Sequence, residues 1–265
     1  MPSGNFFEVD EVFKDNGHYV GKQKDNLVYG YTKRMNGHSP YPVDALNMAL
    51  YIGDDDANVH GNQHIIANGL GIKTERWIAP IQTHGNHIAQ VTYQDAGTNI
   101  YNLGDALNDV DGLYTYDKVL LTMNYADCVP VYIYSEANSF IGLAHAGWRG
   151  TSGRITQRLI ESYEGNISDL RVVIGPSINM NAYEVDDRVI NALRDHGLTD
   201  ECIKETQTGY LLNLKELNKN QALDAGIDEK NIYVTELGTE DTSQFFSFRV
   251  EGGKTGRAMA FIGRK

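Results

Sequence analysis

Between residues 119 and 144 the sequence has three runs of β-branched, aromatic and other apolar residues, with no helix-like segment between them. Such runs, closed by turn-forming residues, are typical of buried strands. Similar patterns predict strands over residues 27–32, 77–82, 170–174, 231–236 and 258–262. Apolar residues at helical spacing predict helices over residues 56–70, 154–163, 187–196 and 214–225. Because consecutive strands lack helices between them, we expect an α+β or mixed-sheet fold and not a regular βαβ alternation.

The length of the chain agrees with one large domain. It has 265 residues, and 41% of them are hydrophobic, which is enough to bury a sizeable core. No Pro-rich, Ser-rich or charge-block linker divides the sequence, and it contains no internal repeat. We therefore expect residues 1–265 to form a single domain.

The charge balance limits the partners of this chain. Lys and Arg number 23 against 35 Asp and Glu, which gives a net charge of −12 without any basic cluster. This argues against a nucleic acid or an anionic membrane as partner, although a small anion could bind at one local basic site. The chain has neither a leader-like start nor an apolar run long enough to cross a bilayer, and it has only two cysteines. We expect a cytoplasmic protein and favour a monomer, although the sequence does not fix the oligomeric state.

Three short segments place histidine or cysteine at the ends of predicted strands, where side chains reach a cleft from rigid supports. They are Ile-Gln-Thr-His-Gly-Asn-His at 81–87, Asn-Tyr-Ala-Asp-Cys-Val-Pro at 124–130, and Leu-Ala-His-Ala-Gly-Trp-Arg-Gly-Thr-Ser-Gly at 143–153. Taken singly, Cys128 is typical of a buried small side chain, and His84 or His145 of a hydrogen-bonded structural residue. Taken together, the three match a catalytic zinc site with an open fourth position. Their spacings, 44 and 17 residues, match no zinc-finger pattern.

The third segment also suggests an anion site. A glycine-rich turn between a strand and a helix can offer backbone N–H groups to phosphate. Arg149 could bind the same phosphate through its guanidinium group, with Gly150, Thr151 and Ser152 as further donors. The alternative is a tight turn with a helix cap. Asp127 precedes Cys128 and is a candidate for proton handling or for orienting a ligand, with a structural turn carboxylate as the alternative.

These motifs resemble the YfiH family, long labelled multicopper polyphenol oxidoreductase or laccase-like and now described as zinc-dependent purine nucleoside phosphorylase. The resemblance rests first on His-Ala-Gly-Trp-Arg-Gly at 145–150, Ala-Asp-Cys-Val-Pro at 126–130 and Gln-Thr-His-Gly at 82–85. It extends over roughly residues 25–262, through segments at 46–55, 111–112, 174–178, 183–185, 246–249 and 255–257. Gly238, Val250 and Gln63 depart from the family pattern, which leaves open how substrate choice is tuned.

The resemblance implies a four-layer α/β/β/α sandwich with mixed sheets, as in the catalytic domain of cytotoxic necrotising factor. It implies zinc bound by His84, Cys128 and His145, and phosphorolysis of adenosine, inosine, guanosine and methylthioadenosine with some adenosine deamination. In that reaction Arg149 and the glycine turn would position phosphate, and zinc would stabilise the departing purine.

Two other enzyme classes compete with this interpretation. A thiol hydrolase would use Cys128 as nucleophile, His145 or His84 as base and Asp127 as orienting group, and the family has been linked to the editing of peptidoglycan precursors. A copper oxidase could use the same two imidazoles and thiol, but multi-electron oxygen chemistry needs more imidazoles than the eight histidines of this chain can supply. Zinc is therefore expected in preference to copper. A non-catalytic zinc module is disfavoured by the open coordination position.

Overall fold

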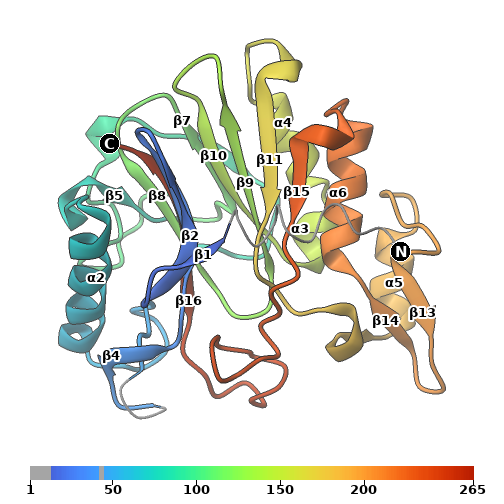
Figure 1. The fold of residues 1–265 in the computed structure, drawn as a ribbon. Coiled ribbons are helices and arrows are strands. Elements are labelled where there is room, and N and C mark those ends of the chain that lie inside the picture. The colour runs from blue at the N-terminus through green and yellow to red at the C-terminus, as the bar shows by residue number, and fades with distance from the viewer. Residues whose placement is uncertain (1–12, 42–44) are drawn as a thin grey trace.

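Two six-stranded sheets face each other at the centre of the protein (Figure 1). The computed structural model describes residues 13–41 and 45–265. In the first sheet the strand order is β1 (Lys14–Asp15), β2 (Tyr19–Lys24), β3 (Leu27–Thr32), β16 (Ala258–Arg264), β8 (Leu120–Tyr125) and β5 (Trp77–Ile78). Its neighbours are antiparallel except for β5 and β8. The last strand of the chain is therefore hydrogen-bonded between two strands from much earlier in the sequence.

The second sheet is also mixed. Its order is β15 (Ile232–Val234), β11 (Leu170–Ile174), β9 (Val129–Ser135), β10 (Ile141–Ala146), β7 (Gly112–Thr115) and β6 (Ile88–Gln90). The four central strands are antiparallel, and the strand at each edge pairs in parallel with its neighbour.

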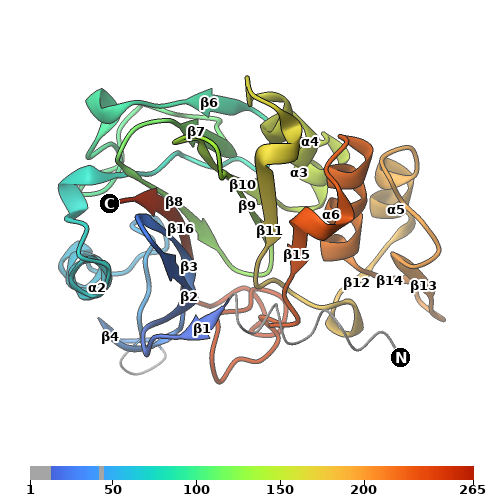
Figure 2. The same ribbon diagram turned by 45° about the horizontal axis from the view of Figure 1, so that its top comes forward.

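Helices cover the outer faces of both sheets, which gives four layers (Figure 2). The helix α2 (Asp56–Leu70) lies outside the first sheet, while α3 (Trp148–Ser152), α4 (Ile155–Glu161) and α6 (Leu214–Asp224) lie outside the second. Single turns of 3-10 helix occur at Thr74–Arg76, Tyr93–Asp95, Ile167–Asp169, Met180–Ala182 and Glu229–Asn231. The predicted four-layer sandwich is thereby confirmed.

Three apolar cores correspond to the three interfaces between these layers. In β16, Ala260 and Ile262 face the core between the sheets, whereas Phe261 faces α2. The same alternation in β10 directs Leu143 into the space between the sheets and Ala144 toward the outer helices. Successive side chains of a strand point to opposite faces, so each central strand contributes to two cores.

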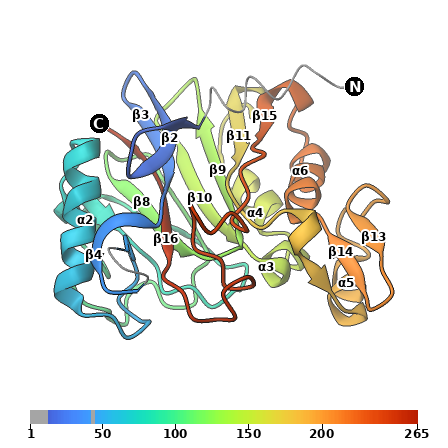
Figure 3. The same cartoon turned by 60° about the horizontal axis from the view of Figure 1, so that its bottom comes forward.

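A smaller sheet lies beside the second set of helices (Figure 3). It contains β12 (Glu184–Val185), β14 (Tyr210–Leu212) and β13 (Ile203–Glu205), and α5 (Asp187–Leu193) lies next to it. The short strand β4 (Met35–Ser39) makes isolated bridges to Ala45. The long segment between β15 and β16 runs past the end of the sheets near α3 (Figure 3).

Several predicted boundaries differ from the structure by a few residues, and two of these differences have clear local reasons. The strand expected over 77–82 ends at Ile78, because Pro80 has no N–H to donate to a ladder, and Ile81 makes only an isolated bridge to Asn108. The helix expected from 154 begins at Ile155, because Arg154 has a left-handed φ of 58°. Within the described residues, no helix is both long and apolar enough to cross a bilayer.

The two sheets are joined by a buried hydrogen bond that can be tested. The Tyr132 hydroxyl on β9 donates to the carbonyl of Gly30 on β3 at 2.9 Å. Replacing Tyr132 with Phe keeps the packing but removes this bond, so we expect the free energy of unfolding to fall by about 0.5–1.5 kcal/mol. Chemical denaturation of Tyr132→Phe measures this change, with Tyr93→Phe at a 59% exposed position as control. An unchanged denaturation midpoint in Tyr132→Phe would show that the bond contributes nothing.

Candidate metal site

The three predicted ligands come together at one end of the sheets. His84 lies in the loop between β5 and β6, Cys128 in the turn between β8 and β9, and His145 near the end of β10. Their ligand atoms all lie within 4.8 Å of one another. His84 is exposed, Cys128 is half-buried and His145 is buried, so the group can be reached by solvent from the side of His84.

A buried carboxylate, that of Asp111, orients two of the three ligands. Its Oδ1 lies 2.8 Å from His145 Nδ1, which leaves Nε2 of that ring for the cluster. The same carboxylate accepts from the backbone N–H groups of Thr83, His84 and Gly85, at 3.1, 3.1 and 2.7 Å. A carboxylate behind a ligating histidine is a common second contact in metal sites, because it fixes the tautomer and the ring orientation.

Asp111 was not predicted as a functional residue. It appeared only as half of the Asp111-Gly112 pair in the family resemblance. The sequence patterns predict no strand at β7, so the position of Asp111 just before that strand, whose Gly112 pairs with Ala144 next to His145, gave no local signal.

The glycines of the 147–153 segment are explained by close packing. A side chain at Gly147 would place its Cβ 2.9 Å from Cys128 Sγ, and one at Gly150 would lie 2.8 Å from the carbonyl oxygen of Gly85. At Gly153 the nearest atom would belong to the Asn86 side chain, at 2.5 Å. Real Cβ contacts are longer, so only glycine lets α3 pack against Cys128 and the loop that carries His84.

This packing changes the role predicted for the glycine turn. Thr151 is fully buried and its hydroxyl accepts from the Asn218 side chain on α6, while the Ser152 hydroxyl donates to the carbonyl of Arg149. Gly150 is also buried, and α3 is a helix of only five residues. Thr151, Gly150 and Ser152 therefore have structural roles in this structure. Arg149 is exposed and remains a candidate for anion binding.

The side chain of Asp127 is hydrogen-bonded to the segment that precedes β16. It has a left-handed φ of 87°, and its side chain is turned toward residues far along the sequence. Its Oδ1 accepts from the Thr239 hydroxyl and its Oδ2 from the backbone N–H of Arg249, both at 2.7 Å. Both carboxylate oxygens are occupied, so the geometry favours the structural alternative over proton handling, and the orienting role next to the ligands belongs to Asp111.

None of the three positions that depart from the family pattern belongs to the group of ligands. Gly238 has no room for a side chain, since a Cβ there would lie 2.3 Å from Asn179 Nδ2. Val250 is exposed, and Gln63 lines a cavity between α2 and the first sheet.

The local charges favour a thiolate at Cys128. Burial alone raises the pKa of this thiol, but the charge of His145 and hydrogen bonds from both histidines lower it to about 6. For His145, burial lowers the pKa, whereas the thiolate charge and the Asp111 hydrogen bond raise it to about 9. Near neutral pH the metal-free group is therefore a thiolate beside an imidazolium ion.

These residues fit a divalent transition metal. Two imidazole nitrogens and one thiolate form a donor set that zinc accepts with an open position, and copper accepts the same set. Among the described residues this is the one group of three or more such ligands. The geometry thus supports a single metal site.

Comparisons with known proteins agree with the site. The family model described as multi-copper polyphenol oxidoreductase laccase matches residues 28–265. The chain is 45% identical over 264 residues to a purine nucleoside phosphorylase of Staphylococcus epidermidis, covering 97% of this chain and 100% of that protein. A purine nucleoside phosphorylase of Staphylococcus saprophyticus is 47% identical over 258 residues, covering 93% of this chain and 95% of the relative.

Solved structures show the same architecture. YlmD from Geobacillus stearothermophilus aligns with a TM-score of 0.91 at 39% identity, over 96% of this chain and 99% of YlmD. The hypothetical protein YfiH of Bacillus licheniformis aligns with the same TM-score at 35% identity, over 96% of this chain and 99% of YfiH. The fold and the ligand group define a mixed α/β protein with a site suited to one metal. The chain belongs to the multi-copper polyphenol oxidoreductase laccase family, also called the YfiH family.

The role of Asp111 gives a prediction about metal affinity. Asp111→Asn keeps the shape of the side chain but replaces the carboxylate by a neutral amide. The carboxylate accepts hydrogen bonds from His145 and from three backbone N–H groups. We expect metal affinity to fall about 10- to 100-fold, as is typical when such a second contact is lost. Competition with a chromogenic chelator measures this, with the exposed Asp105→Asn as control. Equal affinities in Asp111→Asn and the parent protein would contradict the orienting role.

Proposed function

We propose that this protein is a zinc-dependent purine nucleoside phosphorylase. Its substrates would be adenosine, inosine, guanosine and methylthioadenosine, with deamination of adenosine as a second activity at the same centre. The observation that carries the proposal is the convergence of His84, Cys128 and His145 within 4.8 Å, in a chain 45% identical to a protein of that name.

Cleavage of the bond between ribose and purine requires stabilisation of charge on the departing base. A zinc ion held by the three ligands would supply Lewis acidity at that point. The role of the protein is to hold the ligands in place: Asp111 keeps His145 in the tautomer that presents Nε2, and it fixes the backbone of the loop that carries His84.

Phosphate needs a positive site next to this centre, and two arginines support one. The Arg149 guanidinium stacks on Trp148 at 4.4 Å, and that of Arg249 stacks on Tyr183 at 5.0 Å. Burial and the charge of Cys128 raise the pKa of Tyr183, while the charges of Arg249 and Arg149 lower it. The phenol of Tyr183 therefore interacts electrostatically with the thiol and with both arginines. In the described part of the chain neither arginine forms a salt bridge with a carboxylate.

Zinc is preferred to copper in this proposal, because the described residues form one group of metal ligands, whereas a multicopper oxidase needs several copper sites. A reducing, cytoplasmic location would suit the two free cysteines, of which Cys128 is a proposed ligand. The substrates would then be a nucleoside and phosphate, with no part for nucleic acid or membrane.

The direct test is phosphate-dependent release of free base from the four nucleosides, with metal content measured on the same sample. We expect base release to require phosphate and to follow zinc occupancy. Release of base without phosphate, or full activity after the metal has been removed by a chelator, would contradict the proposal.

Arg149 provides a separate prediction. In Arg149→Ala we expect the apparent affinity for phosphate to fall about 10- to 150-fold, because a charge-assisted contact of about 1.5–3 kcal/mol is lost. The apparent affinity for nucleoside should change much less. Initial rates over a phosphate series measure this effect, with the exposed Arg194→Ala at the C-terminal end of α5 as control. If phosphate saturation is the same in Arg149→Ala and the parent, phosphate binds elsewhere.

A thiol hydrolase remains a second candidate, because one observation favours it. Cys128 and His145 form a thiolate–imidazolium pair, and Asp111 orients the imidazole, as in enzymes with a cysteine nucleophile. The orienting group is Asp111, not Asp127 as the sequence suggested. A hydrolase of this kind would act on an amide such as that of a peptidoglycan precursor.

Cys128→Ser separates the two candidates. If Cys128 is a ligand, we expect zinc occupancy and activity to fall together, because a serine hydroxyl is a poorer ligand than a thiolate. Alkylation should then modify Cys128 only after the metal has been removed, with buried Cys202 as the internal control. Full zinc occupancy in an inactive Cys128→Ser protein, with a covalent adduct trapped on the parent, would support the hydrolase.

A further inference from the structure

The backbone of Arg249 is hydrogen-bonded to the residue that precedes a proposed metal ligand. Its N–H donates to Asp127 Oδ2 at 2.7 Å, and Cys128 is the next residue after Asp127. The bond spans 122 positions of the sequence and joins the segment before β16 to the turn between β8 and β9. Asp127 is 8% exposed, so water competes little for its carboxylate. Hydrogen bonds to carboxylates are also stronger than those between neutral groups.

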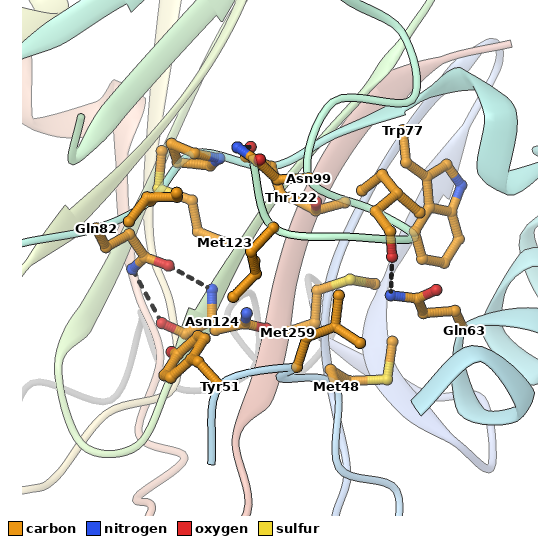
Figure 4. Close-up of a pocket in the computed structure, with 16 residues that line it drawn as sticks. Met48, Tyr51, Gln63, Trp77, Gln82, Asn99, Thr122, Met123, Asn124 and Met259 are labelled. Carbon is orange, nitrogen blue, oxygen red and sulfur yellow. Dashed lines mark hydrogen bonds between the residues drawn. The ribbon is translucent and has the colours of Figure 1, made fainter. Parts of the chain in front are cut away.

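The turn that carries Asp127 is itself fixed on both sides. Figure 4 shows the two hydrogen bonds between the Gln82 amide and the backbone of Asn124, at one end of the cavity between α2 and the first sheet. These bonds fix the end of β8, which leads into the turn. The carbonyl of Asp127 accepts from the N–H of Ile178 at 3.1 Å, and β9 begins at Val129. The backbone at Asp127 therefore has a defined position.

A second hydrogen bond fixes the direction of the Asp127 carboxylate. Its Oδ1 accepts from the hydroxyl of Thr239, which is fully buried. The backbone N–H of Thr239 donates in turn to the carbonyl of Ser177 at 3.1 Å. With Oδ1 bound in this way, Oδ2 is directed at the backbone of Arg249.

The loop that carries Arg249 is closed by another carboxylate. Oε2 of Glu251 accepts from the N–H of Ser247 at 3.0 Å and from the hydroxyl of Thr255 at 2.5 Å. Its Oε1 accepts from Arg34 at 2.9 Å, and both of these side chains are largely buried. Arg249 thus lies in a short loop whose two ends are fixed, and Asp127 binds the loop between them.

The side chain of Arg249 is held as well, although the residue is exposed. Its Nη1 donates to the carbonyl of Glu184 at 2.5 Å, and its guanidinium carbon lies 5.0 Å from the centre of the Tyr183 ring. Within the described residues it forms no salt bridge. Holding a long side chain in one conformation costs entropy, and this cost favours binding because the ligand then has less to order. The remaining N–H groups of Arg249 are therefore preorganised for an anion.

We propose that Asp127 is a positioning residue for phosphate binding. Through the backbone of Arg249 it holds the guanidinium group next to the turn of Cys128, and phosphate binds to that group. Asp127 does not contact phosphate, because both of its carboxylate oxygens are bound to donors of the protein. This inference rests on the proposed phosphorylase function and identifies a residue that acts on its second substrate.

The test compares two variants that remove the same negative charge. Asp127→Asn keeps both bonds, because its amide oxygen accepts from the Arg249 N–H and its amide nitrogen donates to the Thr239 hydroxyl oxygen. Asp127→Gly adopts the left-handed φ of 87° without strain but makes neither bond. Loss of the charge alone would strengthen phosphate binding in both variants. A difference between them therefore reports the hydrogen bonds.

Calorimetry with inorganic phosphate on the zinc-loaded protein measures this difference. We expect the dissociation constant to rise about tenfold in Asp127→Gly and to change by less than about threefold in Asp127→Asn, with zinc content measured on the same samples. The control is Asp25→Gly in the turn between β2 and β3, because Asp25 is an exposed aspartate that also has a left-handed φ, of 54°. Asp25→Gly should bind phosphate like the parent.

Arg249→Ala shows whether Asp127 acts through Arg249. This variant alone should weaken phosphate binding at least as much as Asp127→Gly does. When Arg249 is already alanine, adding Asp127→Gly should change the dissociation constant by less than about twofold, because residues that act as one unit are not additive. In steady-state assays Asp127→Gly should raise KM for phosphate about tenfold and change KM for inosine much less.

The outcomes separate the positioning role from the function. If Asp127→Gly binds phosphate as tightly as Asp127→Asn, or if its effect persists when Arg249 is alanine, the inference is overturned. Phosphate-dependent release of base in the parent would then still support the phosphorylase proposal. If phosphate binding follows the expected pattern but no nucleoside is cleaved, the positioning role stands and the phosphorylase proposal fails.

Discussion

The carboxylate of Asp111 is the contact on which the candidate site depends. It is fully buried and accepts five hydrogen bonds, three from the backbone of residues 83–85, one from the Thr83 hydroxyl and one from His145. Burial raises the pKa of this carboxyl, but the His145 hydrogen bond and charge, together with the backbone donors, lower it overall. Asp111 therefore stays ionised, and one negative charge holds two ligands that are 61 residues apart in the sequence.

The register of the second sheet places this carboxylate. Ala144 on β10 pairs with Gly112 on β7, so the next residues along the antiparallel strands are His145 and Asp111. The backbone N–H of His145 donates to the carbonyl of Asp111 at 2.8 Å, which fixes the same alignment beyond the ladder. A slip of one residue would turn His145 away from the space between the sheets, because strand side chains alternate between faces. The apolar cores that fix the register thus also fix the geometry of the ligands.

Local sequence patterns predicted those helices and strands whose limits are decided within one segment of the chain. The helix over 56–70 and the strands over 27–32 and 170–174 match their predicted limits, because apolar spacing and turn residues decide them within one segment. Asp111 was missed because its partners come from other segments. The glycines at 147, 150 and 153 suggested an anion loop, since a sequence shows that residues are small but not what packs against them. The cavity had no local signal at all, because its lining comes from several separate segments.

Within the described residues Arg34 and Arg171 are the arginines that form salt bridges, and Arg149 and Arg249 do not. Arg34 and Arg171 pair with Glu251 and Glu136, at 2.9 and 2.5 Å, so their charges are neutralised. Arg149 and Arg249 instead lie over the rings of Trp148 and Tyr183. Stacking on a ring holds the plane of a guanidinium and leaves N–H groups at its edge for an anion. In Arg249 one of these groups, on Nη1, already donates to the backbone carbonyl of Glu184. A net charge of −12 is thus compatible with a local phosphate site, because aromatic rings position these cations without cancelling their charge.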